Sequence, residues 1–318
     1  MKRVTESVPT RKKMASLGRD LRRDWQLYVL LLLPMVYLIV FKYLPMGGLA
    51  IVFQDYKPRK GILNSEWIGL GNFIRFFESY EFGRVLKNTV VLSLYTILAG
   101  FPIPIIFALM VNCVRDGKFK KISTTVVNMP HFISTTVMVG ILMMLFNNRT
   151  GMYGFIGYLL TGSYPSDLFA SANNFRHMYV WSGVWQNFGW NSIIYTAALA
   201  GVDPTFHEAA QIDGASRLKR VWHIDFPSLL PTIVTMLILR MGTVMTLGFE
   251  KIYLMQNVLN LSASQVISTY VYEVGLSASG AGDFSYAAAI GMFNNVIELI
   301  LVIVVNKISQ KVSETSLW

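Results

Sequence analysis

The sequence predicts an all-α membrane protein, a polytopic bundle of six transmembrane helices. Hydrophobic residues make up 53% of its 318 residues and charged residues only 14%, whereas soluble domains carry about a quarter charged residues. Several apolar stretches also reach the roughly 20 residues that a helix needs to cross the hydrocarbon core of a bilayer. Basic residues crowd in front of the first of these stretches, as is typical of a cytoplasmic segment.

Residues 1–25 form a basic tail. The chain has a net charge of +10, and the cations before the first apolar stretch are Lys2, Arg3, Arg11, Lys12, Lys13, Arg19, Arg22 and Arg23. This position next to a span favours a cytoplasmic tail at an anionic lipid surface over a nucleic-acid site. The first apolar stretch is too long for a signal-peptide core, so we expect it to remain as a span.

Six spans are predicted in a membrane domain at 26–318. They cover residues 26–46, 87–112, 122–146, 177–201, 228–250 and 286–306. Lys and Arg gather in the tail and in the connections 113–121 and 202–227, while the segment 251–285 holds only Lys251. Because cations mark the cytoplasmic side, this distribution places both termini inside the cell, in a chain of the inner membrane.

Prolines interrupt three of the predicted spans. Pro34 lies in the first, Pro102 and Pro104 in the second, and Pro130 in the third. Each removes a backbone donor and is expected to kink its helix, which suits either a protein that rearranges or an irregular bundle. The sequence has no internal repeat, so six spans favour one half of a two-subunit pore over a single-chain transporter of two similar halves.

The connection 202–227 predicts two short helices joined by a tight turn. Asp203 can cap the first helix, with Pro204 at its first position. Gly214 can end that helix, because glycine adopts positive φ without strain. Ser216 can cap the second helix, which has one apolar face and which Pro227 is expected to stop.

The same connection resembles a known pattern. Permease subunits of binding-protein-dependent ATP-driven importers carry Glu-Ala-Ala, three residues, Gly, nine residues and Ile-x-Leu-Pro at this place. Here the matching residues are Glu208, Ala209, Ala210, Gly214, Ile224 and Pro227, with Phe226 in place of leucine. The runs WIGLGNFIRFF (67–77), MPHFIS (129–134), WQNFGWNSIIYTAALAG (185–201) and the terminal ETSLW are similar to the maltose-type sugar permeases, in their lipoprotein and polysaccharide branch.

This resemblance implies a type I importer fold with cytoplasmic coupling helices. The hairpin would dock into an ATP-hydrolysing subunit through Glu208, Ala209, Ala210, Asp213, Gly214, Ala215, Ile224 and Pro227. The implied partners are a second homologous permease, two ATP-binding subunits and an extracytoplasmic solute-binding protein. The chain has no phosphate-binding loop of the Gly-x-x-x-x-Gly-Lys-Ser/Thr type. We therefore expect no enzyme activity and no cofactor on this chain, with ATP and magnesium on the partner.

Polar residues inside the spans are candidates for a solute path, because such residues usually face the bundle interior or water. They are Gln186, Asn187, Trp190 and Asn191 in the fourth span, Arg240 in the fifth, and Asn294, Asn295 and Glu298 in the sixth. Amides beside indole rings suit sugar hydroxyls and pyranose faces. For any single one of these residues, however, a hydrogen bond between helices is the better explanation.

Arg240 and Glu298 fall near the middles of antiparallel spans, which allows an ion pair between them. Arg240 could instead face the path and bind uronate carboxylates, because a guanidinium group pairs with a carboxylate through two hydrogen bonds. The four histidines show no ligand spacing, and Cys113 is the single cysteine, so no metal site is expected.

These features favour an importer of oligosaccharides, and uronate-rich ones such as those of alginate or pectin are the finer hypothesis. Permeases for peptides or amino acids with the same docking loop stay open as the alternative. A membrane-embedded enzyme would need a catalytic cluster of acids, histidines or nucleophiles inside the spans, and the intramembrane groups are mostly amides, hydroxyls and aromatics. A passive channel would leave the docking loop unexplained.

Overall fold

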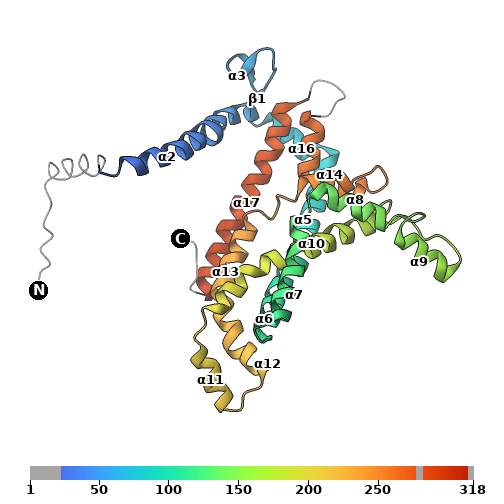
Figure 1. Cartoon of the computed structure of the whole chain (residues 1–318). Helices are drawn as coiled ribbons and strands as arrows, with labels where there is room; N and C mark the ends of the chain where they lie inside the picture. Colours follow the sequence, from blue (N-terminus) through green and yellow to red (C-terminus); the bar gives the residue numbers. More distant parts are fainter. Residues whose placement is uncertain (1–22, 277–281, 314–318) are drawn as a thin grey trace, which may run out of the picture. The chain divides into compact units, whose positions relative to one another are not determined.

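The computed structural model describes residues 23–276 and 282–313 (Figure 1). The chain divides into two units, Met1–Ile68 and Gly69–Trp318. The basic tail before residue 23 lies outside the described residues, as does the whole C-terminal run ETSLW (314–318).

A long apolar helical run dominates the first unit. It consists of helix α2 (Trp25–Leu38), a π-helical turn η1 (Ile39–Tyr43) and a 3₁₀ segment η2 (Leu44–Phe53). Pro34 lies inside α2 without ending it, and the wider π turn follows five residues later. No side chain of α2 or η1 is buried within the chain, so this apolar surface requires lipid or another protein around it.

The rest of the first unit is a small β-ladder, which the all-α prediction missed. Strand β1 (Gln54–Asp55) pairs antiparallel with β2 (Glu66–Trp67), and the single-turn helix α3 (Gly61–Asn64) lies between them. The buried Gln54 donates from Nε2 to the Ile62 carbonyl over 3.0 Å. Two-residue strands lack the alternating pattern by which strands are recognised in a sequence.

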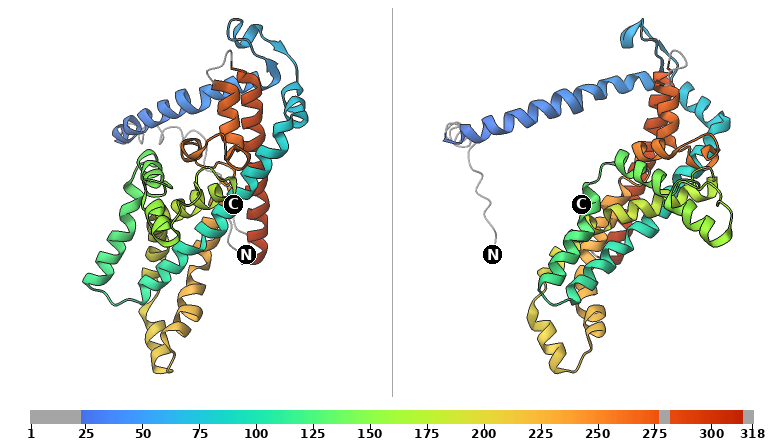
Figure 2. Two further views of the ribbon diagram at one scale, coloured as in Figure 1. Left: turned by 90° about the vertical axis from the view of Figure 1, so that its right-hand side faces the viewer. Right: turned by 45° about the vertical axis from the view of Figure 1, so that its right-hand side comes forward.

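The second unit is a bundle of helices (Figures 1 and 2). Its elements are α4 (Gly71–Glu78), α5 (Tyr80–Gly100), α6 (Pro102–Cys113), α7 (Lys118–Asn128), η3 (Met129–Phe132), α8 (Thr135–Leu145), α9 (Met152–Thr161), α10 (Ala172–Ala200), α11 (Pro204–Ile212), α12 (Arg217–Arg220), η4 (Val221–Asp225), α13 (Phe226–Met241), α14 (Phe249–Met255), α15 (Leu261–Ser264), α16 (Ile267–Leu276) and α17 (Phe284–Ser313).

Helix α10 is at the centre of this bundle. Its buried side chains join an apolar cluster with α5, α8 and α14, in which Leu92, Met138, Phe175 and Ile252 are almost fully enclosed. Further along α10, Tyr195 joins a cluster that also contains side chains of α6 and α13. A third cluster packs α4, α5 and α16 against α17. The helices that carry the polar path candidates are thus held by apolar contacts on several sides.

Four helices among the described residues are long and apolar enough to cross a membrane. They are Trp25–Phe53, Tyr80–Cys113, Arg217–Met241 and Phe284–Lys311, and the pair Lys118–Phe132 with Thr135–Leu145 would make a fifth. Helix α10 is long enough to cross a membrane, at 29 residues, but its polar side chains make it less apolar than these four helices. An all-helical membrane bundle is therefore seen, while six spans are not confirmed.

Two predicted spans differ from the structure. The span 122–146 is broken by 98° between Lys118–Phe132 and Thr135–Leu145. Pro130 lies in the 3₁₀ turn at this break, and Ser134 caps the next helix by accepting from the Val137 amide over 3.4 Å. The span 228–250 is wrong at its end, because α13 stops at Met241 and α14 begins only at Phe249. Glycines at both edges of the intervening segment, Gly242 and Gly248, favour that interruption.

The helix that starts in the hairpin continues into the membrane span. Helix α12, the π segment η4 and α13 form one run of 25 residues, Arg217–Met241, so Pro227 does not stop the second hairpin helix as expected. The π turn lies directly before this proline. Its wider spacing accommodates a residue that has no amide donor and that would crowd the preceding turn.

Candidate functional site: a helical hairpin and a cationic cavity

Local capping contacts form the hairpin of α11 and α12 as the sequence predicts. Asp203 accepts from the Thr205 amide over 2.9 Å, and this bond holds the pKa of its carboxyl below the usual value. Gly214 has φ of +73°, and the Ala215 amide donates to the Ala210 carbonyl over 2.8 Å, which closes α11. Ser216 accepts from the Lys219 amide at the start of α12.

The hairpin presents its motif outward. Helix α11 has no buried residue, and Glu208, Ala209, Asp213 and Gly214 are exposed, while Ala210, Ala215 and Ile224 are half-buried. Two large apolar side chains beside the motif, Phe206 and Ile212, are 62% and 87% exposed. Exposed apolar residues next to small and acidic ones make a surface suited to docking another protein.

A buried carboxylate ties this hairpin to the bundle, and the sequence prediction missed it. Asp225 in η4 is only 2% exposed. Its Oδ1 accepts from Asn112 Nδ2 of α6 over 3.1 Å and lies 3.2 Å from Nε2 of His207 in α11. A single acid at the start of an apolar helix was the signal that could have drawn attention to Asp225.

A cavity of about 560 Å³ lies among α5, α6, α10, α13 and α14. Four of the predicted path residues line it, namely Gln186, Asn187, Asn191 and Arg240. Its wall also includes the rings of Phe101, Phe188, Tyr179 and Tyr195. The structure therefore brings amides, aromatic rings and one predicted cation together around a single space.

Lys251 is a second cation of this cavity, which the sequence prediction placed in a connecting segment. It is 8% exposed, its Nζ donates to the Tyr179 carbonyl over 3.1 Å, and it lies 5.1 Å from the centre of the Tyr179 ring. Among the residues that the structure describes around the cavity, there is no carboxylate. Lys251 is the only Lys or Arg in the segment 251–285, and this isolated position was the signal by which the sequence could have indicated it.

The remaining path candidates lie elsewhere. Trp190 stacks on His131, with ring centroids 4.5 Å apart and planes at 7°. Asn294 and Asn295 line a separate and mainly apolar hollow of about 530 Å³ next to α16. Glu298 accepts from the Thr246 hydroxyl over 2.8 Å. These four residues do not line the cationic cavity.

The expected ion pair between Arg240 and Glu298 is not among those formed by residues 23–276 and 282–313. Arg240 lines the cavity, whereas Glu298 bonds to the irregular segment that follows α13. That segment starts earlier than the sequence prediction placed it, because α13 ends at Met241.

Two of the cavity amides also support the break in the third predicted span. Gln186 Nε2 donates to the Ile133 carbonyl over 2.8 Å, at the point where the chain turns into α8. Asn187 Oδ1 lies 3.0 Å from His131 Nδ1. Both the solute role and the helix-to-helix role that the sequence left open are thus compatible with their positions.

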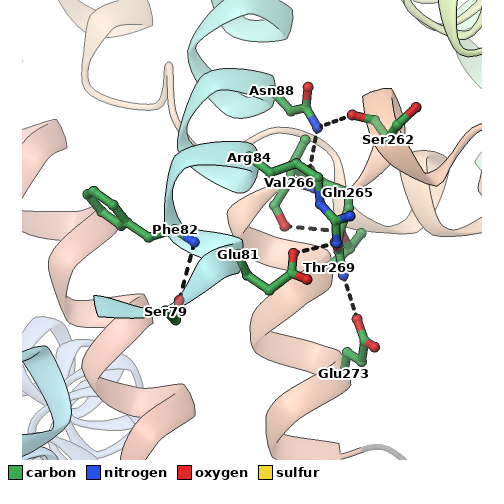
Figure 3. Close-up of polar contacts among 10 residues, drawn as sticks. All are labelled: Ser79, Glu81, Phe82, Arg84, Asn88, Ser262, Gln265, Val266, Thr269 and Glu273. Carbon is green, nitrogen blue, oxygen red and sulfur yellow. Dashed lines mark hydrogen bonds and ion pairs between the residues drawn. The ribbon is translucent and has the colours of Figure 1, made fainter. Parts of the chain in front are cut away.

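At the end of the bundle opposite the hairpin, a polar network joins α5 to α15 and α16 (Figures 1 and 3). Arg84 bonds to both Glu81 and Gln265, and Gln265 donates to Glu273 over 2.7 Å. Asn88 donates to the Ser262 and Gln265 carbonyls over 2.8 and 3.0 Å (Figure 3). This network holds the segment 262–273 against the first turns of α5.

No group of three acidic, histidine or cysteine side chains in the described part of the chain is placed to hold a metal ion. The polar groups of the cavity are amides, hydroxyls and two cations. This arrangement is suited to binding an anionic, hydroxyl-rich molecule by charge and hydrogen bonds.

Comparison with known proteins gives consistent matches. The family profile described as "Binding-protein-dependent transport system inner membrane component" matches residues 83–314. Protein LplB of Bacillus subtilis (strain 168) is 41% identical over 311 residues, which cover 98% of this chain and 96% of that protein. The polygalacturonan/rhamnogalacturonan transport system permease protein YteP of the same organism is 40% identical over 292 residues, 92% and 90% of the two chains.

A solved structure matches over nearly the whole chain. It is a bacterial ABC transporter involved in the import of the acidic polysaccharide alginate, with a TM-score of 0.85 and 34% identity, covering 94% of this chain and 99% of that one. A second structure, of the bacterial alginate ABC transporter in complex with an alginate pentasaccharide-bound periplasmic protein, matches with a TM-score of 0.84 and 34% identity, over 95% and 99% of the chains.

Proposed function

The chain belongs to the inner membrane components of binding-protein-dependent transport systems, and from this premise we propose that it forms half of the pore of an ATP-driven importer for acidic oligosaccharides. As a member of this family it is a multi-pass permease subunit and not an enzyme. The proposal adds the solute, the side of the membrane that the hairpin faces, and the partners.

The cationic cavity is the observation that carries the choice of solute. Arg240 and Lys251 line it together, and no carboxylate does so among the described residues. A uronate carboxylate would gain charge-assisted hydrogen bonds there, while the amides and aromatic rings suit sugar hydroxyls and ring faces. The names of two similar proteins point to the same class, since one transports polygalacturonan and the other the acidic polysaccharide alginate.

The exposed hairpin supports coupling to an ATPase. We propose that α11 docks into an ATP-binding subunit through Glu208, Ala209 and Ala210, and that the turn residues Asp213, Gly214 and Ala215 complete the surface. Ile224 and Pro227 lie where the hairpin joins the span, so they would pass its movement to α13. Closure of the ATPase pair, which holds ATP and magnesium, would then move the spans as rigid bodies.

The complete importer would contain this chain, a second and homologous permease, two ATP-binding subunits and an extracytoplasmic solute-binding protein. The hairpin would face the cytoplasm, and both termini with it. The solved alginate transporter, studied with a periplasmic binding protein, supports this composition by similarity. The cavity would be completed by the second permease and would open alternately to the two sides.

Arg240→Gln tests the choice of solute. In the importer reconstituted with its partners, we expect uptake of an oligogalacturonate to fall roughly tenfold or more, because a hydrogen bond to a charged group contributes about 1.5–3 kcal/mol. Uptake of the methyl-esterified oligosaccharide, which lacks the charge, should change little. Arg149→Gln makes the same chemical change at an exposed site outside the cavity and should leave both rates unchanged. A wild-type ratio of acidic to neutral uptake in Arg240→Gln would refute the proposed role.

Glu208→Lys tests the docking surface. The reversed charge should weaken the contact with the ATP-binding subunit, so that less of this subunit is recovered when the permease is purified. Glu66→Lys, at an exposed residue of the first unit, serves as the matched control. Full recovery of the ATPase with the Glu208 variant would show that α11 is not the docking element.

A further inference from the structure

Two hollows adjoin at the base of the hairpin. The first, of about 510 Å³, lies between the end of α6, the start of α7 and the beginning of the hairpin's second helix. The second, of about 370 Å³, runs along α6 and the helix from α12 to α13. Cys113 and Val221 line both of them, so the two hollows lie side by side and share part of their walls.

The first hollow is cationic. Arg115, Lys120, Arg217 and Arg220 line it, against the carboxylates of Asp116 and Asp225. Both carboxylates are already engaged, because Asp116 pairs with Lys120 over 2.9 Å and Asp225 is held by its bonds to α6 and α11.

Three guanidinium groups therefore lie at this hollow without forming an ion pair inside the described part of the chain. They belong to Arg115, Arg217 and Arg220. The Nε atom of Arg220 is moreover buried without a hydrogen-bond partner. Guanidinium groups bind phosphate well because their donors match its oxygens in pairs, so the side chains at this hollow have the chemistry that a phosphate would need.

The second hollow is apolar. Its wall is made of side chains from two helices, among them Ile106, Met110, Leu218 and Trp222. These four are 54%, 63%, 67% and 59% exposed within the chain. An apolar groove of this kind next to a membrane span can hold the acyl chain of a lipid. One of its two walls is the helix that also carries Arg217 and Arg220.

We propose that this double hollow is a binding site for an anionic phospholipid, with the phosphate among Arg115, Arg217 and Arg220 and an acyl chain along α6 and Trp222. The proposal rests on the proposed function, because the hairpin must face the cytoplasmic leaflet, where anionic lipids attract cations next to a span. A free phosphate would fill the first hollow but leave the apolar one empty. A lipid accounts for both hollows and for their position side by side.

Such a lipid would connect the membrane to the moving part of the importer. Its headgroup would contact the connection between α6 and α7, while also bonding to the helix that continues from the hairpin into α13. The site would therefore couple the composition of the inner leaflet to the position of the hairpin.

Cys113 provides the probe, because it lines both hollows, is exposed, and is the single cysteine of the chain. The complete importer is placed in nanodiscs of phosphatidylcholine with increasing fractions of phosphatidylglycerol. Alkylation of Cys113 by N-ethylmaleimide is followed by mass spectrometry of this chain, without ATP or solute. The reagent is uncharged, so the charge of the bilayer does not change its local concentration.

We expect phosphatidylglycerol to slow the alkylation severalfold. In the double variant Arg217→Gln/Arg220→Gln the fraction needed for half of this effect should rise roughly 30-fold, since each cation contributes roughly fivefold. Arg115→Gln should raise this fraction roughly fivefold. Because Arg115 lies outside any helix, this variant cannot act by unfolding α12, and it therefore controls for a folding defect in the double variant. Lys118→Gln/Lys219→Gln removes two cations from the same surface outside both hollows and should behave as the wild type.

Three results would overturn the proposal. The first is an alkylation rate that does not depend on phosphatidylglycerol. The second is protection of the arginine variants equal to that of the wild type, and the third is protection by inorganic phosphate in pure phosphatidylcholine equal to that by phosphatidylglycerol. The measurement is independent of transport. An importer that does not discriminate acidic solutes but shows this protection would contradict the proposed solute and leave the lipid site intact. An importer that discriminates acidic solutes but shows no protection would contradict the lipid site and leave the proposed solute intact.

Discussion

Replacing Asp225 by asparagine tests whether the hairpin is joined rigidly to the span. Both polar contacts of Asp225 end on the same oxygen, Oδ1, at 3.1 Å from Asn112 and 3.2 Å from His207. Asparagine keeps the shape of the side chain and an acceptor at this position, so the substitution removes the charge and little else. It leaves no cavity that would complicate the result.

The magnitude follows from the two bonds. A hydrogen bond to a charged group contributes about 1.5–3 kcal/mol and a neutral one about 0.5–1.5 kcal/mol, so each bond weakens by about 1 kcal/mol. The total of about 2 kcal/mol corresponds to a roughly 30-fold larger population of detached hairpin. Helix α11 has no buried residue, and a detached helix of fewer than about 12 residues is only marginally stable in water. Detachment should therefore also unfold it.

Hydrogen exchange measures this opening directly, because amide exchange follows the population of locally open states. In the permease pair purified without its ATP-binding subunits, where docking does not hold α11, we expect the amides of residues 205–212 to exchange roughly 30-fold faster in Asp225→Asn, from the arithmetic of the two bonds. Asp55→Asn is the control, because it removes an exposed ion pair with Lys57 in the first unit. Exposed pairs contribute about 0–1 kcal/mol, so this substitution should leave the hydrogen exchange of α11 unchanged. Exchange of α11 within about twofold of the wild type in Asp225→Asn would refute the tether.

Two further substitutions test the packing of the bundle. Gly189→Ala should lower the midpoint of thermal unfolding markedly, because its Cβ would lie 2.4 Å from the Val127 carbonyl oxygen, whereas Gly140→Ala meets nothing within 4 Å and should be neutral or stabilising. A neutral result for Gly189→Ala would mean that α10 does not approach α7 closely at this glycine. Arg84→Gln should increase proteolytic cleavage in the segment 257–265, since it removes bonds to Glu81 and Gln265 that contribute about 1.5–3 kcal/mol each; cleavage equal to that of Arg149→Gln would refute this role of the network.

The hairpin could be predicted almost residue by residue because its determinants are local. An aspartate before a proline, a glycine after the helix and a serine before the next one act within one or two turns of the chain. The structure confirms the caps at Asp203 and Ser216 and the positive φ of Gly214. The expected stop at Pro227 was wrong because the π turn before it changes the spacing of the backbone bonds, and no residue type announces such a turn.

The cavity was predictable only in part because it depends on contacts between distant segments. Of the polar residues inside spans that were selected for a solute path, the structure brings Gln186, Asn187, Asn191 and Arg240 to one cavity, and their contact with solute stays a prediction. The same rule also selected Glu298, whose partner is a threonine 52 positions away. The sequence did not indicate Lys251, because this residue reaches the cavity only when α13 ends at Met241 and the chain returns through α14.

Periodicity could not reveal the interruptions of the helices for a related reason. A span that is apolar on all sides gives no phase by which a break could be recognised. The turn of 98° after Phe132 is supported by Gln186, more than fifty residues further along the chain. Proline signalled a disturbance at that point, but only the neighbouring helix determines how large it becomes.

The uninterrupted helix from Arg217 to Met241 acts as a lever arm. Arg217 lies at its end in the hairpin, and Arg240 lies 23 residues on, near its other end at the cavity. At 1.5 Å per residue the two are roughly 35 Å apart along the axis, so a tilt of about 5° about the Arg217 end carries Arg240 sideways by about 3 Å. A displacement of that size is enough to make or release a hydrogen bond, so in the proposed importer a modest swing of the hairpin would change the contacts of Arg240 with an anionic solute in the cavity.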